Sequence, residues 1–195
     1  MFSESNRALL VTLVADSTLI TGYAISALAP DRRLWPIGDS TWRWLINWSA
    51  FSVVFVGFPV LAYRDWNSFR LTYIPLRIFG AIISTSGMVF ALAALFELGW
   101  MESSGREGEL RTDGIYQYTR NPQTVGFVTF IIGTLLAVNS RKLTLHGLLT
   151  ATIYVLFPFA EESWLHERYG DEYADYCEQT PRFLSRESIT PFLRE

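Results

Sequence analysis

Five apolar runs separated by short polar intervals decide what this chain can fold into. They cover about residues 8–29, 42–63, 73–98, 122–138 and 143–160. A helix that crosses a bilayer needs about 20 mainly apolar residues, so each run is near the length of one span. Half of all residues are hydrophobic, and the charged residues fall mostly in the intervals. The pattern predicts an all-α integral membrane protein, a helical bundle of about five transmembrane helices.

The 195 residues leave room for a single membrane domain. Residues 1–98 hold three spans, and residues 99–195 hold a long polar loop, a helical hairpin and an amphipathic tail. An odd number of spans puts the two ends of the chain on opposite sides of the membrane. It also puts the polar 99–121 loop on the same side as the tail after residue 160. We therefore expect these two polar segments to meet.

The charges and the cysteine content exclude several classes of function. The net charge is only −3 and the arginines are scattered, so we expect no nucleic-acid partner. A single cysteine, Cys177, excludes an internal disulfide and argues against a cysteine-based metal site. No metal and no obligate protein partner is expected. More arginines lie on the side of the 99–121 loop, and the positive-inside rule then places that loop on the cytoplasmic face.

Three polar residues fall inside apolar runs, on the side away from the 99–121 loop. They are Asp16, Arg77 and His146. Because a charge in hydrocarbon is costly, it is usually paired or faces a cavity. Either Asp16 pairs with Arg77, or Arg77 extends to the membrane surface and Asp16 faces a water pocket. We expect His146 to be structural.

The first candidate motif lies where the long loop meets the fourth run. Residues 112–126 read Thr-Asp-Gly-Ile-Tyr-Gln-Tyr-Thr-Arg-Asn-Pro-Gln-Thr-Val-Gly. Asn121 suits a helix cap and Pro122 suits the first helical position, so a helix should begin here. Its N-terminal dipole would then lie beside Arg120. This junction predicts a site for an anionic group.

The second candidate motif begins where the fifth run ends, at Glu161-Glu162. Adjacent carboxylates at the end of a span are costly unless something uses them. Sugar hydroxyls, an ammonium group or Arg120 across the hairpin are suitable partners. The alternative is an interfacial salt-bridge cluster without a ligand.

The tail after the glutamates carries further candidate groups. Asp171, after Gly170, is expected to start a last short helix, on which Tyr173 and Tyr176 share one face. These tyrosines either close over a site or only pack the tail on the bundle. His166, the only histidine on this side, is either a base for an amine or thiol acceptor or a surface residue.

In their order and spacing, the two motifs resemble the isoprenylcysteine carboxyl methyltransferase and phospholipid methyltransferase group of integral membrane enzymes. The family pattern is Gly-x-Tyr-x-x-x-Arg-His-Pro-x-Tyr-x-Gly, a hairpin, then Glu-Glu-x-x-Leu-x-x-x-Phe-Gly-x-x-Tyr-x-x-Tyr. The resemblance covers about residues 98–184, and the chain departs from it at Asn121, Thr124 and Tyr169, and at Phe157-Pro158-Phe159, where members often carry an arginine. The matching residues are Gly114, Tyr116, Arg120, Pro122, Gly126, Glu161, Glu162, Leu165, Gly170, Tyr173 and Tyr176.

The resemblance implies methyl transfer from S-adenosyl-L-methionine, which the family holds between the two motifs without a Rossmann fold. It implies catalytic roles for Arg120 and Glu162. It also implies a lipophilic or lipid-tailed acceptor with a carboxylate, thiol or amine, which enters from the surrounding membrane lipids. The implied cofactor-binding residues are Gly114, Tyr116, Tyr118, Arg120, Asn121, Pro122, Gly126, Glu161, Glu162, Tyr173 and Tyr176.

Two other functions stay open on the sequence alone. A sterol-reductase-like, NADPH-dependent membrane reductase would share a similar C-terminal pattern, including a Tyr-Cys pair such as Tyr176-Cys177. A non-catalytic membrane domain of the same architecture is conceivable because Asn121 and Thr124 replace the family histidine and tyrosine.

Overall fold

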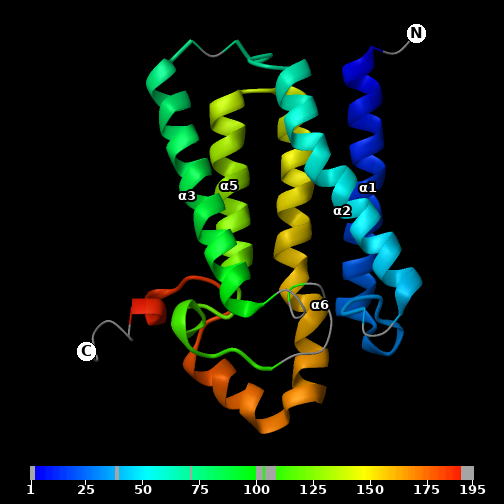
Figure 1. The fold of residues 1–195 in the computed structure, drawn as a ribbon, viewed down its shortest axis with the longest axis vertical. Coiled ribbons are helices and arrows are strands. Elements are labelled where there is room, and N and C mark those ends of the chain that lie inside the picture. Colours follow the sequence, from blue (N-terminus) through cyan, green and yellow to red (C-terminus); the bar gives the residue numbers. More distant parts are fainter. Residues whose placement is uncertain (1–2, 38–39, 71, 100–102, 104–108, 190–195) are drawn as a thin grey trace.

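The computed structural model describes residues 3–37, 40–70, 72–99, 103 and 109–189. Within these ranges the regular structure is entirely helical, and the main helices lie roughly along the long axis of the molecule (Figure 1). The helices are α1 (Glu4–Leu28), α2 (Thr41–Arg64), α3 (Ile74–Leu98), α5 (Pro122–Val138) and α6 (Arg141–Gln179), with short 3₁₀ turns η1 (Pro30–Arg32), η2 (Gly114–Gln117) and η3 (Arg186–Ile189).

The lengths of the helices suit a membrane bundle. α1, α2, α3 and α6 are each long and apolar enough to cross a bilayer. α5 has 17 residues, about 26 Å at a rise of 1.5 Å per residue. The predicted all-α membrane bundle is confirmed. The expected boundaries of the first four runs lie within a few residues of the observed helix ends.

α3 and α5 run side by side because glycines remove the side chains between them (Figure 1). A Cβ atom at Gly126 would lie 2.5 Å from the backbone nitrogen of Ala91, and one at Gly80 would lie 2.7 Å from that of Ala137. Small residues of this kind let two helices approach closely in a membrane. The contact holds the start of α5 beside the end of α3.

The other half of the bundle is an aromatic core between α1, α2 and α6. Tyr23 on α1 lies edge-on to Phe157 on α6, with ring centroids 5.3 Å apart. Trp35, from the segment between α1 and α2, lies 4.9 Å from the same Phe157 ring and is only 1% exposed. Aromatic pairs at such distances add to the free energy gained by burial. This core ties the N-terminal half of the chain to α6.

The intramembrane charges are arranged differently from either expected arrangement. Asp16 is fully buried and pairs with His146, with Oδ2 and Nδ1 2.7 Å apart, and its other oxygen accepts a hydrogen bond from Thr150. Arg77 donates to the Ala137 carbonyl and lies over the Trp66 ring. The predicted Asp16–Arg77 pair is therefore wrong. His146 has a structural contact, as expected.

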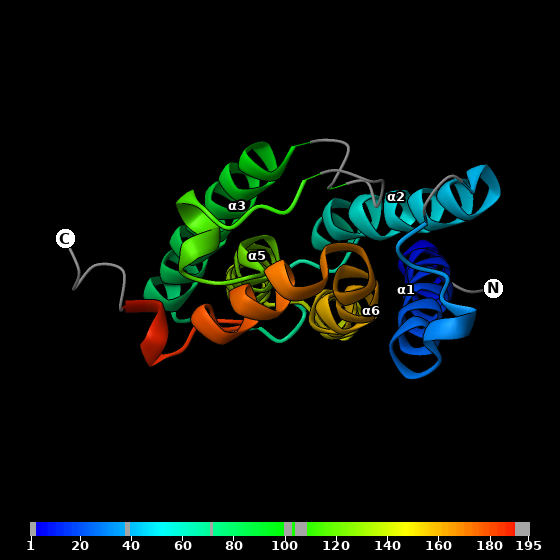
Figure 2. The same cartoon turned by 90° about the horizontal axis from the view of Figure 1, so that it is seen from below.

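α6 is the longest helix and does not end at the glutamates. The helix continues through Glu161 and Glu162 without interruption. The sequence had predicted that the span would end at residue 160, just before these glutamates. Its one non-helical residue is Gly170, with φ 52° and ψ −125°, a conformation that glycine adopts readily. The expected break before the last short helix is confirmed at this glycine. Figure 2 shows the helix after Gly170 crossing beneath α5.

Candidate active site

The two sequence motifs meet at the end of the bundle where α3 ends, α5 begins and α6 bends (Figure 1). η2 is held there by Glu97 on α3, whose carboxylate accepts a hydrogen bond from the Ile115 N–H at 2.8 Å. Pro122 is the first residue of α5, as predicted. These contacts fix the loop-to-helix junction against α6.

A cavity of about 140 Å³ lies between the motifs. Its inner side is apolar, formed by Tyr154, Phe157 and Pro158 of α6 together with Thr124 of α5. Its outer part is polar. The remaining lining residues are Leu98, Ser103, Glu109, Leu110, Arg111, Tyr116, Arg120, Asn121, Pro122, Gln123, Glu161, Glu162, Trp164, Leu165, Tyr169, Tyr173, Tyr176 and Arg182.

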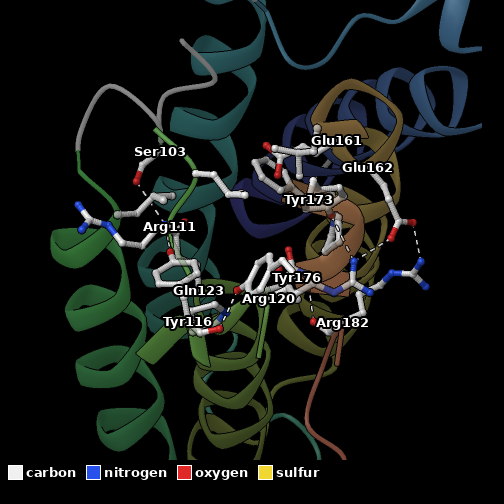
Figure 3. Close-up of a pocket in the computed structure, with 18 of the residues that line it drawn as sticks. Ser103, Arg111, Tyr116, Arg120, Gln123, Glu161, Glu162, Tyr173, Tyr176 and Arg182 are labelled. Carbon is white, nitrogen blue, oxygen red and sulfur yellow. Dashed lines mark hydrogen bonds and ion pairs between the residues drawn. The ribbon is translucent and has the colours of Figure 1, made fainter. Parts of the chain in front are cut away.

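Two guanidinium groups share the carboxylate of Glu162 (Figure 3). Arg120 Nη1 lies 3.1 Å from Oε1, and Arg182 Nη2 lies 2.5 Å from Oε2. The Nε–H groups of both arginines are buried without a hydrogen-bond partner among the described residues. With two cations on one carboxylate, this end of the cavity carries excess positive charge and two unused donors.

Arg120 also contacts the tail helix. Its Nη1 donates to the Tyr173 hydroxyl at 3.3 Å and to Cys177 Sγ at 2.7 Å. Burial alone would lower the pKa of Arg120, but the contacts with Tyr173, Cys177 and Glu162 raise it overall. The guanidinium is therefore held as a permanent cation in a place shielded from water.

The polar wall opposite these arginines is built around Tyr116 (Figure 3). Its hydroxyl donates to the Ala94 carbonyl at 3.2 Å and lies 3.3 Å from Gln123 Nε2. Tyr176 donates to the Tyr116 carbonyl at 2.6 Å, which joins the tail helix to η2. Burial raises the pKa of Tyr116 far above its ordinary value, so the hydroxyl stays neutral.

A short segment after α6, residues 180–183, crosses the start of α5 as a strap. The Arg120 N–H donates to the Pro181 carbonyl at 2.9 Å. The Arg182 carbonyl accepts from the Thr119 hydroxyl at 3.1 Å and from the Asn121 side-chain amide at 3.0 Å. Asn121 occupies the N-cap position of α5, but its side chain makes no capping bond. The predicted cap is therefore wrong, because the amide holds the strap instead.

The adjacent glutamates face different surroundings. Glu161 Oε1 accepts a hydrogen bond from the indole N–H of Trp35 at 2.7 Å. No lysine or arginine among the described residues forms an ion pair with it, in contrast to Glu162. Trp35 thus links the first half of the chain to Glu161, a residue that lines the cavity.

The structure brings eight of the predicted site residues to the cavity and leaves three outside its lining. Gly114 packs against Glu97 with φ +57°, where a Cβ atom would overlap the carboxylate. Gly126 is in the α3–α5 contact, and Tyr118 is not in the cavity lining. His166 is exposed, with its ring 4.7 Å from the Tyr173 ring and outside the lining. The eight are Tyr116, Arg120, Asn121, Pro122, Glu161, Glu162, Tyr173 and Tyr176.

The residues that sequence reasoning missed include Arg182 and Tyr154, which line the cavity, and Trp35, which binds Glu161 beside it. Arg182 follows a helix end in a tail with several charges, and Trp35 lies in a loop far away in sequence. Tyr154 sits within an apolar run, where a tyrosine gives no separate signal. For Trp35, the only local signal is its place before Pro36, at a turn between two spans.

The site's donor set fits the charged and aromatic groups of S-adenosyl-L-methionine. The unused Nε–H groups of Arg120 and Arg182 suit a carboxylate. Carboxylates suit an ammonium group or ribose hydroxyls. The buried rings of Tyr173 and Tyr176, 6.3 Å apart, suit a flat or cationic group.

Comparison with known proteins returns methyltransferases. The family model described as phospholipid methyltransferase matches residues 76–172. The protein-S-isoprenylcysteine O-methyltransferase of Schizosaccharomyces pombe (strain 972 / ATCC 24843) is 35% identical over 75 residues, which are 37% of this chain and 31% of that protein. The chain therefore matches under a third of that relative's length. No solved structure matches the chain.

Proposed function

Because this chain belongs to the phospholipid methyltransferase family, we propose that it is a membrane enzyme that transfers a methyl group from S-adenosyl-L-methionine to a small lipophilic acceptor. The observation that carries the proposal is the cavity at the end of the bundle. There the arginine of the first motif meets the glutamates of the second, at 3.1 Å between Arg120 and Glu162. An interfacial salt-bridge cluster alone would leave no reason for two buried, unused guanidinium donors.

Each residue of the site has a defined task in this proposal. S-adenosyl-L-methionine supplies an electrophilic methyl group when bound. Arg120 holds the carboxylate of its methionine part, and Glu162 receives its ammonium group or a ribose hydroxyl. Tyr173 and Tyr176 stack against it and exclude water, which strengthens the polar contacts. The chain's main contribution is alignment of the two reactants.

The acceptor reaches the cavity from the bilayer. Tyr154 on the inner wall stacks on Phe127 of α5, with ring centroids 4.6 Å apart. Phe127 in turn lies 6.2 Å from Phe55 of α2, which is 41% exposed on the apolar outer surface. This aromatic row makes the bundle apolar between the cavity wall and the lipid-facing side, which suits an acceptor with an apolar tail. Residues 1–98 would then shape the acceptor side, and the cofactor side would lie on the cytoplasmic face.

Calorimetric titration of the purified protein with S-adenosylhomocysteine and with NADPH tests this proposal. We expect binding of S-adenosylhomocysteine and none of NADPH. Binding of NADPH alone would point to the reductase alternative, which is not favoured because both comparisons return methyltransferases. Binding of neither would contradict both enzymatic functions.

A further inference from the structure

A separate polar recess lies at the same end of the bundle as the cavity. It is formed by η1 with the residue that follows it, by the first turn of α2 and by α6 (η1 is blue, at the lower end of α1 in Figure 1). Three guanidinium groups share the recess with two carboxylates, which leaves one positive charge in excess among the described residues. None of the lining residues belongs to the cavity. They are Pro30, Asp31, Arg32, Arg33, Arg43 and Glu167.

Only one of the three arginines forms an ion pair in the described part of the chain. Nη1 of Arg33 lies 2.6 Å from Oε2 of Glu167. Arg43 donates from Nη1 to the Arg33 carbonyl at 3.3 Å, and its Nε–H is buried without a hydrogen-bond partner. Arg32 is exposed and pairs with no carboxylate among the described residues. Arg32 and Arg43 therefore keep donors for an anion from outside the chain.

The residues next to the recess along the chain are apolar and exposed. Leu28, at the end of α1, is 86% exposed, and Trp42 and Leu45 of α2 are 58% and 54% exposed. The Arg43 guanidinium lies 5.4 Å from the centre of the Trp42 ring. Tryptophan is enriched at the level of the lipid headgroups. The recess thus suits the depth at which a phospholipid carries its phosphate, beside apolar surface on which acyl chains can lie.

Guanidinium groups bind phosphate through pairs of N–H donors. Basic recesses between transmembrane helices bind anionic lipid headgroups on the cytoplasmic side of a membrane. The positive-inside rule would put this end of the bundle on that side.

We propose that the recess binds the headgroup phosphate of an anionic phospholipid, with Arg32 and Arg43 as the main donors. Glu167 competes with the lipid because it occupies Arg33. The lipid is a bound component of the membrane domain and is distinct from the acceptor of methyl transfer. Its binding does not depend on the proposed enzymatic function.

A built site differs from the general attraction between arginines and an anionic membrane. General attraction amounts to about fivefold in affinity for each arginine near the surface, wherever that arginine lies. A built site becomes saturated with a single lipid, and its affinity depends on the arginines of the recess alone.

The test measures the lipid retained by the purified full-length protein in detergent, by native mass spectrometry. The probes are dioleoylphosphatidylglycerol and dioleoylphosphatidylcholine, which have the same chains and differ in charge, and sodium phosphate is the soluble competitor. The variants are Arg32→Gln, Arg43→Gln and Glu167→Gln. Arg141→Gln is the matched control, because Arg141 is exposed at the opposite end of the bundle, over the Phe69 ring.

We expect a single phosphatidylglycerol to be retained about tenfold more tightly than phosphatidylcholine. Arg32→Gln and Arg43→Gln should each lower this affinity by about fivefold or more, and Arg141→Gln should change it by less than about twofold. Glu167→Gln should raise the affinity by about threefold or more, since it removes a negative charge and frees Arg33. Sodium phosphate should not displace the lipid, because it lacks the acyl chains.

Several outcomes would overturn the inference. Equal retention of the two lipids, or equal losses in Arg43→Gln and Arg141→Gln, would mean that the recess has no special role. Displacement of the lipid by sodium phosphate would assign the recess to a free anion. An unchanged or lower affinity in Glu167→Gln would also overturn it. A gain of affinity cannot come from unfolding, so this variant decides the question even if Arg43→Gln fails to fold.

Discussion

The long helix α6 contributes side chains to two polar clusters, and these are built in opposite ways. The first joins Asp16, His146 and Thr150 in the half of the bundle away from the cavity, and the side chains of Asp16 and His146 are 0% exposed. Each oxygen of Asp16 has a partner, and the second ring nitrogen of His146 lies 3.1 Å from the Val54 carbonyl. This cluster is complete by itself.

The second cluster joins Arg120, Glu162 and Arg182 at the cavity. Here the charges do not balance, two N–H groups have no partner among the described residues, and the side chains line open space. A polar group that is buried and unpaired costs free energy unless a ligand satisfies it. A cluster in which every polar group has a partner holds helices together, whereas a cluster with unpaired polar groups suits a ligand. The presence of charge alone does not distinguish the two.

We call the fully paired cluster of Asp16, His146 and Thr150 the closed cluster. Breaking it should give the largest effect on stability. Asp16→Ala leaves His146 and Thr150 without their partner in an apolar surrounding, and removal of one member of a buried pair costs about 3–5 kcal/mol. Equilibrium unfolding in detergent measures this loss. The affinity of the folded fraction for S-adenosylhomocysteine should stay within about twofold.

Asp16→Asn is the matched control, since it keeps an oxygen for Thr150 while removing the acid. Its loss of stability should lie between those of the unmodified protein and Asp16→Ala. If Asp16→Ala unfolds like the unmodified protein, the closed cluster does not hold the bundle together.

At Gly126, packing can be separated from ligand binding. A Cβ atom there would lie 2.5 Å from a backbone atom of α3, so Gly126→Ala should cost about 1–3 kcal/mol of stability through overpacking. Cofactor affinity should change little. Gly22→Ala is the control, because its Cβ would meet nothing closer than Leu34 at 3.9 Å. A loss of affinity without a loss of stability in Gly126→Ala would instead support the predicted cofactor role of Gly126.

Features that repeat along the chain could be predicted from the sequence, and so could the junction of the two motifs. Apolar runs gave the helices, and topology together with motif order predicted that Arg120 would meet the glutamates. Glycine and proline marked the break at Gly170 and the start of α5 at Pro122. Each of these depends on local chemistry or on the number of spans.

Contacts that depend on helix rotation could not be predicted. The partner of Asp16 depends on which face α1 turns toward α6. The sequence suggested Arg77 or a water pocket, and nothing in it indicated that His146 would be the partner. Asn121 binds the Arg182 carbonyl of the strap. This partner is distant in sequence, so no rule based on neighbouring residues predicts it. Trp35 reaches Glu161 across 126 positions, and a single tryptophan in a loop gives no sign of such a contact.

The cluster of Arg120, Glu162 and Arg182 at the cavity is the open cluster. Breaking it should affect ligand affinity more than stability. Arg120→Ala removes a guanidinium meant for the ligand, so the affinity for S-adenosylhomocysteine should fall about tenfold or more, equal to about 1.4 kcal/mol. Calorimetry measures the change. Arg111→Ala is the control, since Arg111 also lines the cavity but is 41% exposed and, among the described residues, forms an ion pair only with Asp113, at 3.5 Å. Equal losses in both variants would mean that overall charge, rather than the cluster, attracts the ligand.

The smallest effect should come from the strap that completes the open cluster. Asn121→Ala removes one of two side-chain donors to the Arg182 carbonyl, and a hydrogen bond of this kind contributes about 1 kcal/mol. The strap should open more often, and hydrogen–deuterium exchange at the Arg120 N–H, which donates to Pro181, should rise about fivefold. Thr119→Val removes the other donor and should do the same. Because the closed cluster is far from the strap, exchange in the peptide around His146 should not change. If exchange rises equally at both places, the two clusters belong to one cooperative unit and the distinction between them fails.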